Sequence, residues 1–171
     1  MMQLIATKRP AAEKYDRLNF VRDDGSSAAI DMPRQGILPH DLLHYLVEAG
    51  LGLSGGFLSL VAAGQDAHYV MDLVHALDRR DILHDAVHAE ALVEAMQTQL
   101  WSGCYDHQAF LYGVQTASES RGIESPLVPS QDRGMALFEA AIALNRQWAA
   151  LSAYQTLVLE FPPASAKQAK R

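Results

Sequence analysis

The first third of the chain alternates apolar and polar residues with the period of two that is typical of half-buried β-strands. This pattern covers the second half of residues 15–22 and continues in residues 28–32, while residues 3–7 resemble a further strand. An Asp-Gly pair at residues 24–25 separates the two runs and indicates a tight hairpin turn, because glycine accepts a positive φ. Pro33 is then expected to end the second strand of the hairpin.

From Pro39 onward, apolar residues recur every three or four positions, which is the spacing of one face of an α-helix. Proline suits the first turn of this helix, where a missing N–H removes no hydrogen bond, and Gly50 and Gly52 are expected to end it. Serine, proline and glycine are frequent in residues 118–133, which are therefore predicted to form an exposed loop. The further helices are predicted at residues 67–77, 80–100, 106–118 and 134–151.

The pattern changes again at residues 156–161, which are short, apolar and partly β-branched, and Pro162 and Pro163 end the run. This segment is predicted to be a strand that joins the N-terminal hairpin. The fold class is therefore α+β: a mostly helical single globular domain, residues 1–163, with a small antiparallel sheet formed by the N-terminal β-hairpin and the C-terminal strand. Residues 164–171 are predicted to be a disordered tail.

Composition narrows the classes of partner. The chain has 171 residues, of which 20 are acidic and 14 are basic, so its formal net charge is −6. Such a protein lacks the broad positive surface that binds a phosphate backbone, and we expect no nucleic-acid partner. We expect no membrane partner and a cytoplasmic location, because the sequence has neither a bilayer-length apolar run nor a signal-peptide pattern. The single Cys104 is expected to be a buried structural thiol.

Histidines supply the candidate chemistry of this chain. Four of the seven form two copies of the pattern H-D-x-x-H, one from His40 to His44 and one from His84 to His88. Residues four positions apart lie on the same face of a helix about one turn apart, close enough to share a ligand.

The first pair has a carboxylate one further turn along, so that His40, His44 and Glu48 are predicted to form a narrow polar stripe opposite the leucines of the same helix. Two imidazoles and a carboxylate are a suitable ligand set for zinc or another divalent metal. The pattern is similar to the H-E-x-x-H of metalloproteases, with Asp41 in place of the general base, so Asp41 is the candidate catalytic residue. A solvated helix face is one alternative, and a hydrogen-bonding or proton-transfer role without metal is another.

The second pair, His84 and His88, is predicted to project away from the apolar stripe of the long helix, beside Asp81 and Asp85. This position favours a solvated face. In the alternative arrangement, the two polar helix faces turn toward each other and build one site with four histidines, as facing helices do in metal-binding bundles.

Two further patterns are interpreted as structural. The glycine-rich residues 50–56 lack the Lys-Ser/Thr pair of a phosphate-binding loop and are predicted to form a tight turn between packed helices. Trp101, Phe138 and Trp148 have helical spacing among apolar residues and are predicted to lie in the core.

Residues 38–48 carry the segment L-P-H-D-L-x-H-x-x-V-E, which resembles a family of uncharacterised bacterial proteins, and the stretch from Trp148 to Pro162 is similar to the end of these proteins. The resemblance implies a bacterial, cytoplasmic protein and singles out the first histidine pair. It implies no activity, because none is assigned to the family.

Two hypotheses on function result. The first is a non-catalytic binding or oligomerisation module, and it is favoured because polar helix faces are more often contact or solvated surfaces than metal sites. Its polar helix face and 118–133 loop would contact a protein partner or a second copy of the chain, as in a homodimer. In the alternative, His40, His44 and Glu48 hold a divalent metal such as zinc, and Asp41 orients a ligand or a water in a metal-binding protein or a metal-dependent hydrolase. His84 and His88 are further candidate ligands.

Overall fold

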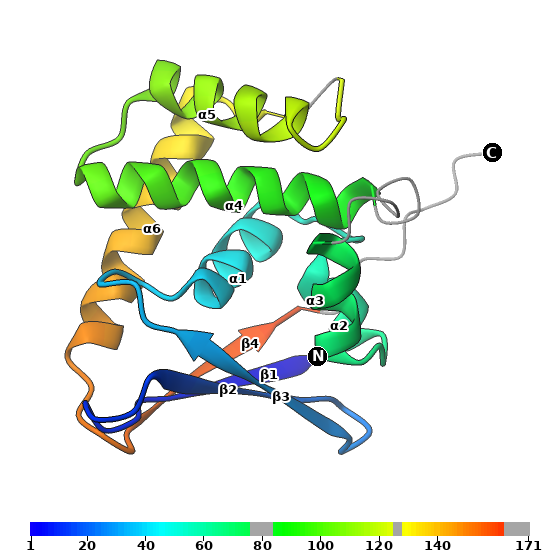
Figure 1. The fold of residues 1–171 in the computed structure, drawn as a ribbon, viewed down its shortest axis with the longest axis vertical. Helices are drawn as coiled ribbons and strands as arrows, with labels where there is room; N and C mark the ends of the chain where they lie inside the picture. Colours follow the sequence, from blue (N-terminus) through cyan, green and yellow to red (C-terminus); the bar gives the residue numbers. More distant parts are fainter. Residues whose placement is uncertain (76–83, 125–127, 163–171) are drawn as a thin grey trace.

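An antiparallel sheet of four strands forms one side of the molecule, and the described helices lie over a single face of it (Figure 1). The structure, a computed structural model, describes residues 1–75, 84–124 and 128–162, without the side chains of residues 74, 75 and 84. The predicted disordered tail, residues 164–171, and the predicted first turn of the long helix, residues 80–83, lie outside the described residues. The predicted α+β class is confirmed.

The sheet contains β1 (Met2–Thr7), β2 (Tyr15–Val21), β3 (Ser27–Pro33) and β4 (Thr156–Phe161) in the order β3-β2-β1-β4. The Asp-Gly hairpin is confirmed between β2 and β3, where Gly25 has a φ of 80°. The C-terminal strand joins the sheet as predicted, but its neighbour is β1 and not the β2–β3 hairpin. β1 therefore lies between β2 and β4.

Alternate residues of each strand point toward the helices, and this inner face is mostly apolar, with the exception of Asp16, which is buried and pairs with Arg34. The apolar side chains are fully buried in one core with leucines and valines of the helices, and they include Leu4, Leu18, Phe20, Ile30 and Met32. The helices therefore pack against the sheet through one shared hydrophobic core.

The described residues form six helices: α1 (His40–Leu51), α2 (Phe57–Ala62), α3 (Ala67–His75), α4 (His84–Ser102), α5 (His107–Glu119) and α6 (Gln131–Ala149). Helix α6 begins three residues before its predicted start, because the Ser130 side chain accepts a hydrogen bond from the backbone N–H of Arg133 and caps the helix. The apolar residues 57–62 form α2, and Gly52 ends α1 in the left-handed conformation, as expected of a turn between packed helices.

Helix α4 crosses the centre of the helical layer, with α1 on its sheet side and α5 on the other (Figure 1). The described residues of its predicted apolar stripe are buried, namely Ala86, Ala89, Val93, Met96 and Leu100, but so are Val87, Ala91 and Leu92 on other sides of the helix. Two predictions near its end are wrong. Trp101 is 57% exposed, although the preceding Leu100 of α4 is buried, and Cys104 is exposed in the turn to α5. Phe138 and Trp148 lie in the core as predicted.

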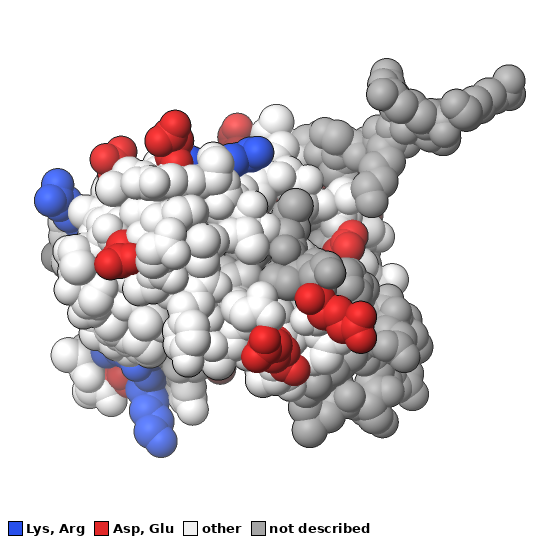
Figure 2. Space-filling view, turned by 90° about the horizontal axis from the view of Figure 1, so that it is seen from above, with Lys and Arg blue, Asp and Glu red and all other residues white. Residues whose placement is uncertain are grey.

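In the part of the chain that the structure describes, no helix has both the length and the apolar character needed to cross a bilayer. Seen from above, the described Lys and Arg side chains are scattered singly among Asp and Glu side chains (Figure 2). This face therefore presents no continuous basic patch among the described residues.

Candidate metal centre

Helix α1 brings the first histidine pair together. Pro39 caps the helix with a φ of −52°, and His40 and His44 follow in its first two turns. The two imidazole rings are 5.0 Å apart between centroids, as the spacing of four residues predicts. His44 is only 3% exposed and packs against Phe57 of α2, while the side chain of His40 is 31% exposed.

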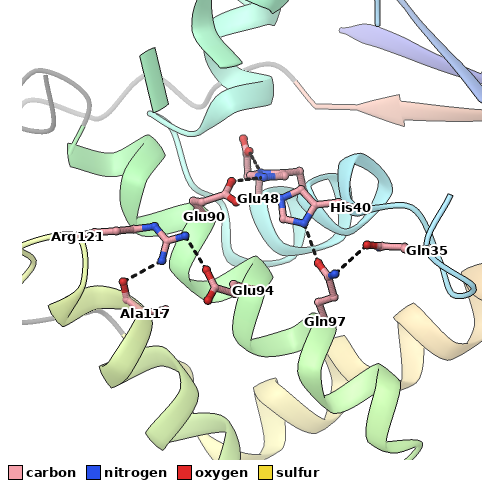
Figure 3. A network of polar contacts seen from close by, with 9 residues as sticks. Gln35, His40, Glu48, Glu90, Glu94, Gln97, Ala117 and Arg121 are labelled. Carbon is pink, nitrogen blue, oxygen red and sulfur yellow. Dashed lines mark hydrogen bonds and ion pairs between the residues drawn. The ribbon is translucent and has the colours of Figure 1, made fainter. Parts of the chain in front are cut away.

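Glu90 of α4 joins the two histidines (Figure 3). Its Oε1 lies 3.0 Å from Nε2 of His40, and its Oε2 lies 2.9 Å from Nε2 of His44. One ligand atom from each of the three residues lies within 4.8 Å of the others. Two donors on a tetrahedral zinc ion are about 3.3 Å apart when each is 2.0–2.1 Å from the metal. Small side-chain rotations would therefore convert this cluster into a set of metal ligands.

Glu48 faces the other side of His44. Its Oε1 lies 3.0 Å from Nδ1 of His44, and its carboxylate also accepts from the backbone N–H groups of Leu58, at 3.0 Å, and Ser59, at 3.4 Å. Both N–H groups belong to the first turn of α2. The backbone of α2 can come this close to Glu48 because residue 56 is glycine, since a Cβ there would lie 2.3 Å from Cδ of Glu48. The side chain of Glu48 is fully buried, and the interpretation of the polar stripe as a solvated face is therefore wrong for His44 and Glu48.

His40 has a corresponding outer partner. Its Nδ1 lies 2.8 Å from Oε1 of Gln97, which is two turns beyond Glu90 on α4. Each histidine thus turns Nε2 toward Glu90 and Nδ1 toward an oxygen on another side chain. A histidine that binds a metal usually donates its second ring N–H to such an oxygen, which fixes the tautomer and the orientation of the ring.

The electrostatics of the cluster depend on burial and on these contacts. Burial lowers the pKa of His44, but its hydrogen bonds to Glu48 and Glu90 outweigh this effect and raise the pKa to about 10. Burial also opposes protonation of His40, whose pKa is nevertheless raised by Glu90. The pKa of Glu90 is raised by burial and lowered more strongly by the two imidazoles, so it falls well below its usual range. Without a metal, one carboxylate thus lies between two imidazolium groups.

A cavity of about 270 Å³ opens beside the cluster, with His40, His44 and Glu90 on its polar side and Phe57 and Met71 on its apolar side. Asp41 also lines this cavity and is only 6% exposed. Burial raises the pKa of its carboxyl group. Because Asp41 lines this cavity, it can contact a molecule bound there.

The second histidine pair is not part of this cluster as far as the structure describes it. His88 is half-buried on α4, two residues before Glu90, and is not a member of the group formed by His40, His44 and Glu90. The side chain of His84 lies outside the described residues.

Sequence reasoning missed Glu90, Gln97 and Gln35, which supply the other half of the site. One signal was present for Glu90: it interrupts the apolar run from Ala89 to Val93 in a helix that is apolar on several sides. An acid in such a helix is expected to be buried and therefore to need a partner. The partner itself could not be identified without the packing of α1 against α4.

Comparison of the chain with protein-family models, with curated proteins and with solved structures gives no match.

Proposed function

We propose that the protein binds one divalent transition-metal ion, such as zinc, through Nε2 of His40, Nε2 of His44 and the carboxylate of Glu90. The observation that carries the proposal is the orientation of the two histidines. Both present Nε2 to one carboxylate, and both have Nδ1 hydrogen-bonded to an oxygen that the fold holds in place. Two imidazoles and a carboxylate form the protein ligand set of known catalytic zinc sites.

Energetics also favour a functional role for the cluster. Burying carboxylates and imidazoles costs free energy, and well-packed apolar residues in their place are often neutral or stabilising. Ionisable groups with strongly shifted pKa values that line a cavity are typical of functional sites. Here His44, Glu90 and Asp41 combine burial, a shifted pKa and access to the same cavity.

We assign Glu90 as the third ligand in place of Glu48. The carboxylate of Glu48 is occupied by His44 Nδ1 and by the N-terminus of α2, and it does not reach Nε2 of either histidine. In this arrangement Glu48 orients His44 and increases its basicity.

His40, His44 and Glu90 would hold the ion, and the chemistry that such an ion would supply is activation of a bound water for hydrolysis. Asp41 is the residue that would accept a proton in the cavity, because it is buried and lines the cavity beside the histidines. Phe57 and Met71 provide the apolar wall against which a small substrate packs.

Metal content tests the assignment directly. After zinc loading and dialysis, untagged wild-type protein should retain one equivalent by elemental analysis, and Glu90→Gln and His40→Ala should lose it. Glu94→Gln is the matched control, because Glu94 lies one turn along α4 and pairs with Arg121 at the surface. The proposal is wrong if folded wild-type protein retains no stoichiometric zinc, cobalt, nickel, manganese or iron, or if Glu90→Gln retains as much as Glu94→Gln.

Activity tests the hydrolytic part. Zinc-loaded protein should hydrolyse p-nitrophenyl acetate, and Asp41→Asn should keep its zinc but lose about 10²–10⁴-fold in rate, as expected for removal of a general base. Zinc binding without zinc-dependent hydrolysis would leave a metal-binding protein and exclude this reaction.

The hypothesis of a non-catalytic binding or oligomerisation module stays a prediction. Sedimentation velocity at micromolar concentration tests its homodimer form, and a strict monomer would exclude that form.

A further inference from the structure

A chain of three hydrogen bonds connects the ring of His40 to the backbone before α1 (Figure 3). His40 Nδ1 lies 2.8 Å from Gln97 Oε1, and Gln97 Nε2 donates to Gln35 Oε1 at 2.8 Å. Gln35 Nε2 in turn donates to the carbonyl oxygen of Leu38 at 2.8 Å. The two glutamines therefore link the ring to a backbone group only two residues before His40.

This chain has one chemically consistent direction. A carbonyl oxygen can only accept, so Gln35 must turn its NH₂ group toward Leu38 and its oxygen toward Gln97. Gln97 must then turn its NH₂ group toward Gln35, which leaves its oxygen for His40. That oxygen accepts from Nδ1–H, so the proton that a metal ion would displace is the one on Nε2, which faces the Glu90 carboxylate.

We propose that Gln97 and Gln35 are positioning residues that select the Nδ1–H tautomer of His40 and so make its Nε2 a metal ligand. This inference rests on the metal site proposed above. It extends that site to two neutral residues, one on α4 and one in the β3–α1 connection, neither of which touches the metal.

The same logic applies to His44 with a different outer partner. Glu48 can only accept, since it is held by the N–H groups of Leu58 and Ser59, and it therefore requires Nδ1–H on His44. The buried ring of His44 is oriented by the carboxylate of Glu48, and the partly exposed ring of His40 is oriented by the amide of Gln97. In both arrangements Nε2 faces Glu90 and would become a ligand when a metal ion displaces its proton.

Substitutions of Gln97 separate positioning from packing. Gln97→Met keeps an unbranched side chain of similar length but removes the acceptor, and zinc affinity should fall about 10–100-fold, the usual effect of losing such a partner. Gln97→Glu keeps an acceptor for Nδ1–H, and affinity should equal or exceed that of the wild type. Gln35→Met should give an intermediate loss. Gln115→Met, on the exposed face of α5, is the matched control and should have no effect.

Cobalt(II) absorption and ring ¹⁵N shifts supply a readout that packing alone would not change. In cobalt-loaded Gln97→Met the ligand-field spectrum should change, while Gln97→Glu should retain the wild-type spectrum. Equal losses of affinity in Gln97→Met and Gln97→Glu, or unchanged affinity in Gln97→Met, would overturn the proposal. Circular dichroism confirms that each variant is folded before its affinity is compared.

Failure of the metal site and failure of the positioning role are distinguishable in metal-free protein. Both ring nitrogens of metal-free His40 face an acceptor, and ring ¹H and ¹⁵N spectra should show a hydrogen-bonded Nδ1–H in the wild type and in Gln97→Glu that is lost in Gln97→Met. If metal-free wild-type His40 shows no hydrogen-bonded Nδ1–H, the positioning role is wrong whether or not metal binds.

Discussion

Replacing Glu48 by glutamine removes one charge from a fully buried carboxylate and leaves its size unchanged. The wild-type oxygens accept from His44 Nδ1–H on one side and from the backbone of Leu58 and Ser59 on the other. An amide has only one oxygen. If that oxygen faces α2, the NH₂ group meets the N–H of His44; if it faces His44, the NH₂ group meets the N–H groups of α2. In either orientation the NH₂ group of glutamine faces an N–H donor, and at least one hydrogen bond of the wild type is lost.

The magnitude follows from the bonds that are lost. A hydrogen bond to a charged group contributes about 1.5–3 kcal/mol, so the free energy of unfolding of metal-free Glu48→Gln should fall by about 2 kcal/mol. For a chain of 171 residues, this corresponds to a decrease in Tm of about 4–8 °C. Zinc affinity should also fall about 10–100-fold, because the outer partner of a ligating histidine is lost. The variant should still bind zinc, unlike Glu90→Gln.

Urea unfolding followed by circular dichroism measures the stability, and competition with a chelating dye measures the zinc affinity. Glu139→Gln on the exposed face of α6 is the control, and its stability should change by less than about 0.5 kcal/mol. If Glu48→Gln is as stable as Glu139→Gln, the assignment of Glu48 as a charged acceptor of three groups is refuted. A destabilised variant with unchanged zinc affinity would refute the role of Glu48 in orienting His44, and complete loss of zinc would restore Glu48 as a ligand.

Other features of the structure lead to further expected outcomes. Gly56→Ala has no backbone strain but places a Cβ 2.3 Å from Glu48 Cδ, so overpacking should lower the unfolding free energy by about 1–3 kcal/mol in urea titrations; unchanged stability would contradict this close approach. Because the pKa of His44 is raised to about 10 in the metal-free protein, zinc must displace a proton at neutral pH, and apparent affinity should rise with pH, about tenfold per unit for each proton released. Calorimetry in two buffers of different ionisation enthalpy measures this release, and binding without proton release would contradict the protonated state. Asp106→Ala removes the side-chain cap of α5 and should cost about 1 kcal/mol in thermal unfolding, whereas Asp132→Ala, which removes no cap, should cost less; equal losses would contradict the capping role.

Local patterns were sufficient for most of the secondary structure. The Asp-Gly turn, the buried alternation of the strands and the helical spacing of apolar residues depend on neighbours within one element, so a sequence contains them directly. The place of β4 beside β1 depends on pairing between the two ends of the chain, which no local pattern specifies. The exposure of Trp101 also depends on tertiary packing, since helical spacing alone does not show which faces of α4 other elements cover.

The candidate site was half predictable. His40 and His44 are neighbours through helical geometry alone. Glu48 is eight residues from His40, which is an axial distance of about 12 Å at 1.5 Å per residue, so these two side chains could not share one ion however well they align on a face. A third ligand had to come from another element, and only the packing of α1 against α4 identifies Glu90.

Glu90 contacts residues 46 and 50 positions away in the sequence, so an ion held by His40, His44 and Glu90 is a removable cross-link between α1 and α4. The unfolded chain does not hold these three ligands together, and an ion that binds only the folded form stabilises it in proportion to the logarithm of its concentration. At a free concentration of 100 times Kd, this linkage amounts to about 2.7 kcal/mol. The unfolding temperature of the protein should therefore rise with free zinc, and its concentration dependence measures occupancy of the site before any substrate is known.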